Sequence, residues 1–379
     1  MTATAGALAA PPTGALPLPA YHPDPRMRRR TYAALDLGTN NCRLLIARPA
    51  RDGFFVVDSF SRVVRLGEGL LASGRISDAA QDRALEALKI CAGKLRRREV
   101  TLARSVATEA CRRAANGPKF IERVYGETGI ALDVITAAEE ARLAVLGCQT
   151  LIDPARGRAL VFDIGGGGGP PPAGGGRARG GAPAPRAGGG GVVLFRAGGP
   201  PALVGPAPRS GGGTDLLHWT SVPWGVISLA ETEPGPLTTE AERLTAYQRM
   251  HGRMTQGLAR FREQILNGDG PQQLLGTSGT VTTLAALYLD LPSYDRRQVD
   301  GCDVPSDAMR ALGLRLAGYA PSERAALPTI GPDRADLIVA GCAILESILA
   351  AFPGLPLRIA DRGIREGILR TLIARDAAP

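Results

Sequence analysis

A short turn after an apolar strand carries the first residues that could do chemistry. The stretch from Asp36 to Arg43 reads DLGTNNCR and joins a carboxylate, a glycine turn and an arginine. Glycine and small polar residues let the backbone N–H groups of such a turn face an oxyanion. Asp36 could then lie beside a metal ion or a water molecule, and Arg43 could neutralise phosphate charge. An ordinary hairpin turn is the alternative interpretation, because short glycine turns are common.

A second turn of the same kind follows another apolar strand. Ala159 to Ile164 (ALVFDI) is a short buried run that places Asp163 directly before Gly165, Gly166 and Gly167. Taken alone, this turn indicates a phosphate-binding site as weakly as the first turn does. Two such turns, each opening an α/β unit, are stronger together, because facing turns from two lobes could hold a phosphate chain and its metal ion between them.

The elements that must position these turns alternate between strand-like and helical patterns. Apolar positions recur at helical spacing from Ser77 to Arg98, and a strand, turn and strand are indicated from Thr31 to Ile46. Further strands and helices then alternate, which is typical of an α/β layer. The first unit is predicted to end near Ile152 and the second to begin at Ala159. In the second unit we expect a strand at Ser221 to Leu229 and a helix at Glu240 to Leu266.

The overall composition limits the class of protein. A chain of 379 residues exceeds the usual single core, so two domains with a cleft between them are expected. Hydrophobic residues make up 44% without a long apolar run, and the arginines of the first thirty residues come late, so neither a membrane span nor a secretory signal is predicted. Scattered cysteines and three histidines disfavour a zinc site and favour reduced thiols in a cytoplasmic protein.

The net charge and one segment of biased composition say less about the class of protein. The formal charge of +9 favours an anionic partner, but several arginines fall in the first thirty residues and in the stretch from Gly165 to Gly213. That stretch is dominated by Gly, Pro, Ala and Arg, a composition that buries too little apolar surface to offset the entropy of ordering it. We therefore expect no stable structure from Gly168 to Gly213, whether the segment is a genuine insertion or an error in the sequence record.

Ten stretches in order along the chain give the sequence a specific resemblance. They are Ala34 to Leu45, Arg65 to Gly69, Val106 to Asn116, Ile135 to Leu143, Val161 to Gly167, Ser221 to Glu231, Gly276 to Leu284, Tyr294 to Gly301, Arg334 to Glu346 and Ala360 to Gly367. In these the chain resembles the Ppx/GppA phosphatase family, relatives of sugar kinases, actin and the Hsp70 ATPase domain. The resemblance covers nearly the whole chain outside the first thirty residues and the Gly-rich segment.

The resemblance implies an α/β fold of the actin-like ATPase (ribonuclease H-like) type, duplicated into two lobes with a cleft between them. The expected domains are a tail at 1–30, domain I at 31–152 with a C-terminal helix at about 357–379, and domain II at 153–356, interrupted at 167–213. No C-terminal HD-type helical region is recognised, so the short two-domain form of the family is expected.

The implied activity is Mg²⁺-dependent release of the terminal phosphate from inorganic polyphosphate, from guanosine pentaphosphate, or from both. No membrane or specific nucleic acid is expected as a partner, and a homodimer is one assembly to be considered. A polyphosphate or alarmone binding protein with impaired catalysis is the alternative. A sugar kinase or an actin-like ATPase shares the fold, which alone does not fix function.

The resemblance also implies roles for individual residues. Glu109 matches a glutamate that would polarise the attacking water, and Glu140, with Asp163, matches the acidic residues near the metal ion. The residues that match phosphate-binding positions are Asp36, Gly38, Thr39, Asn40, Asn41, Arg43, Arg65, Arg112, Gly165, Gly166, Gly167, Gly276, Gly279 and Thr280. The alternatives are a solvated carboxylate at Glu109, surface salt bridges at Arg65 and Arg112, and an ordinary helix cap at Thr280.

One departure from the family pattern affects the second turn. The family continues Gly-Gly-Gly-Ser-Thr-Glu into a strand, whereas this chain continues Gly167-Gly168-Gly169-Pro170-Pro171. The hydroxyl groups and the carboxylate expected to bind phosphate and metal are therefore absent, together with the hairpin that should follow. This departure is the reason for keeping a protein of impaired catalysis as the alternative.

Overall fold

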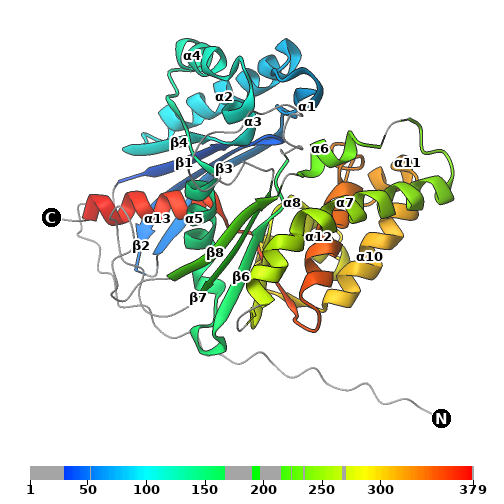
Figure 1. The fold of residues 1–379 in the computed structure, drawn as a ribbon. Helices are drawn as coiled ribbons and strands as arrows, with labels where there is room; N and C mark the ends of the chain where they lie inside the picture. Colours follow the sequence, from blue (N-terminus) through cyan, green and yellow to red (C-terminus); the bar gives the residue numbers. More distant parts are fainter. Residues whose placement is uncertain are drawn as a thin grey trace, which may run out of the picture.

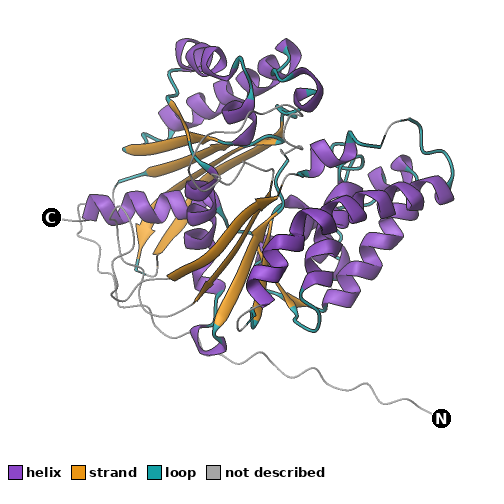
Figure 2. Cartoon of the chain, viewed as in Figure 1, coloured by secondary structure: helices purple, strands orange, loops and turns teal. Residues whose placement is uncertain are grey.

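The computed structural model describes residues 30–51, 53–166, 190–196, 215–222, 224–233, 235–266 and 270–377. Two β-sheets form the centres of two lobes, and helices cover both sheets (Figure 1, Figure 2). Among the described helices, none is long and apolar enough to cross a membrane.

The first sheet has the strand order β3-β2-β1-β4-β5. Its strands are β1 (Tyr32–Leu37), β2 (Asn41–Ala50), β3 (Gly53–Val63), β4 (Leu102–Ala107) and β5 (Leu132–Val134). β1, β2 and β3 are antiparallel neighbours, while β1, β4 and β5 are parallel. The parallel strands end at one edge, so the residues that follow them share that edge of the sheet.

The second sheet repeats this arrangement. Its order is β10-β11-β9-β6-β7-β8, formed by β6 (Arg158–Asp163), β7 (Gly190–Arg196), β8 (Asp215–Val222), β9 (Gln273–Thr277), β10 (Asp303–Val304) and β11 (Leu357–Ala360). β6, β7 and β8 are antiparallel, and β6, β9 and β11 are parallel. The order β8-β7-β6-β9-β11 thus matches β3-β2-β1-β4-β5, which confirms the predicted duplicated, actin-like α/β fold.

Helices pack on the outer faces of the two sheets and between them. They are α1 (Leu70–Ser73), α2 (Asp78–Arg97), α3 (Glu109–Arg113), α4 (Gly117–Thr128), α5 (Ala137–Cys148), α6 (Val226–Ala230), α7 (Glu240–Leu266), α8 (Gly279–Tyr288), α9 (Arg296–Val299), α10 (Ser306–Gly318), α11 (Pro321–Ala325), α12 (Ile338–Ala351) and α13 (Ile364–Ala377), with 3-10 turns at Gln149–Leu151 and Pro154–Arg156. Buried residues of α2 and α4 form one core with the first sheet, and those of α7, α8, α10 and α12 form another with the second.

Two helices cross between the sheets (Figure 1). α5 follows β5, the last strand of the first repeat, but its buried residues pack on β6 and β9 of the second sheet. α13 follows β11 and packs back on β1 and β2 of the first sheet. The helices approach closely at glycines: a Cβ at Gly147 would lie 2.0 Å from the carbonyl oxygen of Gly363, and a Cβ at Gly367 would lie 2.1 Å from that of Leu143. The crossing therefore requires residues without a side chain.

The structure differs from the expected domain limits in two places. Leu357–Ala360 forms β11 of the second sheet, so the chain returns to the first lobe at α13 and not at residue 357. The prediction of no stable structure from Gly168 to Gly213 is wrong for Gly190–Arg196, which pairs with both β6 and β8. The hairpin thought to be missing is therefore present. Residues 1–29 and the rest of the Gly-rich segment lie outside the described residues.

Candidate functional site

The first glycine turn lies at the end of β1, where it was predicted. Asp36 pairs in register with Arg43 of β2, and the N–H of Gly38 donates to the carbonyl of Asn41 at 2.9 Å. The carbonyl of Asn40 accepts from Val64 and Arg65 at 2.8 and 3.1 Å. These bonds fix the turn between β1 and β2 while leaving Asp36 at the edge of the sheet that faces the second lobe.

The second turn lies at the end of β6 and meets the first. Its backbone carbonyls at Gly165 and Gly166 accept from the first N–H groups of α6, at Val226 (3.0 Å) and Ile227 (3.1 Å). A Cβ at Gly166 would lie 2.9 Å from Cβ and 3.0 Å from the backbone nitrogen of Asn40. The two glycine turns are therefore in direct contact, one from each lobe.

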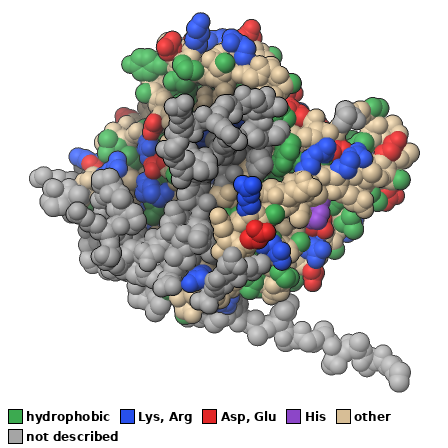
Figure 3. Space-filling view, viewed as in Figure 1, with side chains coloured by type: hydrophobic (Ala, Val, Ile, Leu, Met, Phe, Trp, Pro, Cys, Tyr) green, Lys and Arg blue, Asp and Glu red, His purple; other side chains and the backbone are tan. Residues whose placement is uncertain are grey.

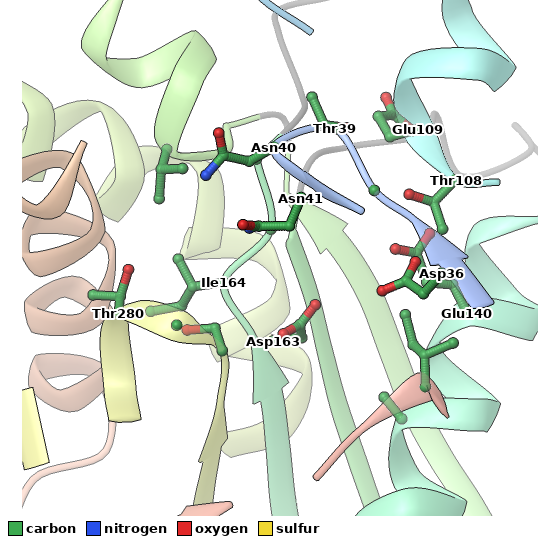
Figure 4. Close-up of a pocket in the computed structure, with 18 of the residues that line it drawn as sticks. Asp36, Thr39, Asn40, Asn41, Thr108, Glu109, Glu140, Asp163, Ile164 and Thr280 are labelled. Carbon is green, nitrogen blue, oxygen red and sulfur yellow. The ribbon is translucent and has the colours of Figure 1, made fainter. Parts of the chain in front are cut away.

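A cavity of about 130 Å³ opens beside this contact and is lined by residues of both lobes (Figure 4). Most of the residues singled out from the sequence line it, namely Asp36, Gly38, Thr39, Asn40, Asn41, Arg43, Glu109, Glu140, Asp163, Gly165, Gly166, Gly279 and Thr280. Helices and strands separated by more than two hundred residues in the sequence thus contribute to one cavity.

Three carboxyl groups line the cavity, with Asp36 and Glu140 side by side and Asp163 apart from them at the end of β6 (Figure 4). Burial raises the pKa of Glu140 to about 8, and the charges of Asp163 and Asp36 add to this effect against the opposing charge of Arg112. Burial likewise raises the pKa of Asp163 to about 6. The pKa of Asp36 is raised for the same reason, and its buried Oδ1 has no hydrogen-bond partner among the described residues. In these three half-buried carboxyl groups the negative charge of one raises the pKa of another, and a cation bound between them would stabilise their charged forms.

Glu109 differs from these three because arginines already pair with it. Its side chain is 5% exposed, Arg112 Nη2 donates to its Oε2, and Arg113 Nη1 lies 3.7 Å from its Oε1. Arg112 also donates to the carbonyl of Ile135 at 2.6 Å and lies 3.5 Å from the carboxylate of Glu140. Arg112 therefore links the two glutamates and holds α3 against the start of α5.

Two arginines meet at the beginning of α8, and one of them, Arg43, also acts on the carboxyl groups of Asp36 and Asp163. The position of a Cβ on Gly279 is 3.6 Å from Nη2 of Arg43 and 3.9 Å from Nη1 of Arg334. Arg43 comes from the first lobe and Arg334 from the second, where its Nη1 donates to Thr283 at 2.9 Å. Free N–H groups at a helix N-terminus beside two guanidinium groups suit an anion. The cavity thus has both acidic and basic lining residues.

A model of the Ppx/GppA phosphatase family matches residues 45–168 and 210–375 of the chain. The chain belongs to this family. As a member of the Ppx/GppA phosphatase family, the protein is a hydrolase. The match is interrupted only across the Gly-rich segment in which the departure from the family pattern was found.

Individual relatives of this Ppx/GppA protein are similar along nearly their whole length. Exopolyphosphatase 2 of Mycobacterium tuberculosis is 29% identical over 355 residues, covering 90% of this chain and 98% of the relative. A putative exopolyphosphatase of Haemophilus influenzae is 25% identical, covering 92% and 94%. A crystal structure of an exopolyphosphatase from Cytophaga hutchinsonii has a TM-score of 0.73 at 24% identity, with 91% of this chain and 98% of that chain covered. The family member from Aquifex aeolicus gives a TM-score of 0.67 at 24% identity, covering 92% and 99%.

Three described residues proposed for phosphate binding in this Ppx/GppA protein do not line the cavity, and a fourth proposed residue is not described. Arg112 is engaged with Glu109, as above, and Arg65 Nη2 donates across the cleft to the carbonyl of Asp333 at 3.3 Å. A Cβ at Gly276 would lie 2.8 Å from the ring of Phe162, so this glycine serves packing within the second sheet. The fourth, Gly167, lies outside the described residues.

Sequence reasoning assigned no role to Arg334, although the family-like stretch that begins with it was recognised. No local pattern distinguishes it from the many surface arginines of the chain. Only the packing of the turn before α12 against α8 places its guanidinium opposite Arg43.

Proposed function

We propose that the protein releases the terminal phosphate of inorganic polyphosphate in a Mg²⁺-dependent hydrolysis. The observation that carries the proposal is the contact of the two glycine turns beside a cavity that is lined by three carboxyl groups and two arginines. The relatives named exopolyphosphatases add to it. Guanosine pentaphosphate ends in the same kind of phosphoanhydride and is proposed as a second substrate.

The substrate would lie beside the two arginines. Arg43 and Arg334 would neutralise phosphate oxygens, and the N–H groups at the start of α8 would donate to them. The N–H groups of the two glycine turns would contact the terminal phosphate, since turns of this kind present several N–H groups to one oxyanion. Phosphoryl transfer needs chiefly a positioned nucleophile and neutralised oxygens, so such an arrangement suits the reaction.

Among the described residues, no three His, Cys, Asp or Glu side chains come close enough to hold a metal ion by themselves. Mg²⁺ commonly uses one or two carboxylates and completes its shell with water and phosphate oxygens. The buried, unpartnered Oδ1 of Asp36 and the raised pKa of Asp163 fit such a partial set. Asp163, together with Asp36, would hold the ion, which leaves the carboxyl group of Glu140 free to act on water. A bound Mg²⁺ supplies neutralisation of phosphate oxygens and lowers the pKa values of the nearby carboxyl groups.

We propose Glu140 as the residue that accepts a proton from the attacking water, with Glu109 as its orienting neighbour through Arg112. Both carboxylate oxygens of Glu109 face arginines, whereas Glu140 is approached by Arg112 alone, at 3.5 Å. Without a metal ion the pKa of Glu140 is about 8, and a bound Mg²⁺ would lower it toward the pH at which Glu140 must exchange a proton. A base is most effective when its pKa lies near the operating pH. This assignment exchanges the roles that the sequence resemblance implies for the two glutamates.

Figure 3 shows where the charged side chains lie on one face of the molecule. Basic and acidic side chains are interspersed there over the helices of the second lobe. The interlobe cavity is therefore the place to which we assign substrate binding.

The proposal is tested by measuring phosphate release from long-chain polyphosphate with Mg²⁺ and with EDTA. Phosphate release that depends on Mg²⁺ and stops in Glu140→Gln is expected. Release by Glu140→Gln equal to that of the parent would contradict the proposed base. The same assay with guanosine pentaphosphate decides on the second substrate.

A polyphosphate-binding protein of low activity is the second candidate, because the family match stops where the Ser-Thr-Glu continuation should follow. The triple change Gly168→Ser, Gly169→Thr and Pro170→Glu restores that continuation. If this candidate is right, the parent binds polyphosphate without turnover, and the triple variant gains phosphate release.

A further inference from the structure

Arg334 lies on a turn between α11 and α12, and a buried arginine holds this turn from inside the second lobe. Arg324 is 6% exposed, and its Nε donates to the carbonyl of Ala335 at 2.8 Å, the residue next to Arg334. Its Nη1 donates to the carbonyl of Tyr319 at 2.6 Å and lies 3.4 Å from that of Leu316. One guanidinium group therefore ties the end of α10 to the residue that follows Arg334.

Burying the charged guanidinium group of Arg324 at this position costs free energy. Arg324 is in none of the ion pairs of the described residues, and burial lowers its pKa against the opposing charge of Asp336. Two of its partners, the carbonyl groups of Tyr319 and Ala335, lie outside the helices, so the guanidinium supplies a donor to acceptors that no helix bond satisfies. A planar group with several fixed donors is suited to this, and lysine is not.

The turn itself has few other anchors on the side of the cleft. Within it, the N–H of Arg334 lies 3.4 Å from the carbonyl of Gly331, and the N–H of Ile338 donates to the carbonyl of Arg334 at 3.0 Å. Arg65 of the first lobe contacts the same turn through the carbonyl of Asp333. The guanidinium of Arg334 is bonded to Thr283, and the position of its backbone depends on the contacts to its two neighbours, Asp333 and Ala335.

We propose that Arg324 is a positioning residue that fixes Arg334 for its contact with the anionic substrate, acting through the carbonyl of Ala335. Arg324 itself does not line the cavity. The inference rests on the proposed anion site, because it assigns to Arg324 an effect that reaches substrate only through Arg334.

The test is a double-mutant cycle with tripolyphosphate as the probe, measured by calorimetry in EDTA and with Mg²⁺. Arg324→Met is expected to weaken tripolyphosphate binding about tenfold when Arg334 is present and by less than about twofold in an Arg334→Met background, since coupled residues are not additive. Equal losses in the two backgrounds would overturn the proposal. If Arg324→Met does not fold, Arg324→Lys, which keeps the charge, replaces it in the same cycle.

Arg243 provides a matched control. It also binds carbonyl groups of the second lobe, at Gly318 (2.9 and 2.7 Å) and Thr238 (2.9 Å), but does not contact Ala335. Arg243→Met should leave tripolyphosphate binding unchanged at matched stability. A loss equal to that of Arg324→Met would show a general effect of destabilising the lobe and would overturn the proposal.

Hydrogen exchange separates this inference from the proposed function. In Arg324→Met, the amides of residues 331–338 should exchange faster, while those of α7 and β9 keep their protection. Unchanged exchange at 331–338 overturns the positioning role, whatever the protein binds. If the parent binds no tripolyphosphate, the proposed function fails, and the exchange result still decides whether Arg324 fixes the turn.

Discussion

Gly166 of the second lobe packs directly on Asn40 of the first, with only 2.9 Å between Cβ of Asn40 and the place a Cβ would take at Gly166. This contact joins the two turns that begin the two repeats. It places Asp36 and Asp163 on the same cavity although 126 residues separate them (163 − 36 − 1).

Gly166→Ala should force the two turns apart and reduce phosphate release. Real Cβ atoms essentially never approach backbone or side-chain atoms this closely, so the loops must shift. A shift of about 1 Å in a site can lower the rate by about 10²-fold. The loss is measured as the steady-state rate of phosphate release. The control is Gly252→Ala, where an added Cβ meets nothing within 4 Å. Equal rates for both variants would show that the contact is not needed for catalysis.

Gly147→Ala and Gly367→Ala should destabilise the protein by about 1–3 kcal/mol or more, because each adds a methyl group at a close backbone contact between α5 and α13. Urea unfolding monitored by circular dichroism gives the change. Gly126→Ala in α4, with open space around its Cβ, is the control and should stabilise by about 0.4–1 kcal/mol. If all three variants unfold at the same urea concentration, α5 and α13 do not make the close backbone contacts that exclude a side chain at Gly147 and Gly367.

Glu140 should make stability depend on pH. Its pKa in the folded protein is about 8, above the ordinary glutamate value of 4.5, so the folded state binds the proton more tightly than the unfolded state. The contribution of protonated Glu140 to the free energy of unfolding is fully present below about pH 4.5. This contribution is lost as the pH rises through 8. In EDTA, the melting temperature of Glu140→Gln should therefore exceed that of the parent by a larger margin at pH 9 than at pH 5. A margin that does not grow with pH would contradict the burial of this carboxyl group.

Glu109→Gln distinguishes orientation from proton transfer. Replacement keeps the size of the side chain but weakens its bond to Arg112, so the rate should fall less than in Glu140→Gln, whose loss of the base is commonly worth about 10²- to 10⁴-fold. Rates of both variants per folded molecule, from phosphate release and melting curves, decide between them. A larger loss in Glu109→Gln would return the role of base to Glu109.

Sequence patterns predicted the two strand-and-turn units because each is local: an apolar strand runs directly into a glycine turn at Asp36 and at Asp163. They could not place β7, because Gly190–Arg196 lies within a biased segment and becomes a strand by pairing with β6 and β8. The predicted strand at Ser221 to Leu229 is divided in the structure, with β8 ending at Val222 and α6 beginning at Val226.

Sequence patterns also could not predict which arginines line the site. Arg112 and Arg334 are both arginines in family-like stretches, and nothing in the sequence shows that one pairs with Glu109 while the other lines the cavity. Which residue each guanidinium meets depends on the packing of α3 against α5 and of α12 against α8. Such pairings are set by the tertiary fold and have no local pattern.

The most direct test of the account is the release of orthophosphate from long-chain polyphosphate by the purified full chain with Mg²⁺, with Glu140→Gln prepared in the same way to exclude contaminating phosphatases. The account predicts steady release by the parent and a loss of about 10²- to 10⁴-fold in Glu140→Gln, with binding of polyphosphate retained in both. A parent that binds polyphosphate but releases no phosphate would contradict the account, and so would equal release by the two proteins.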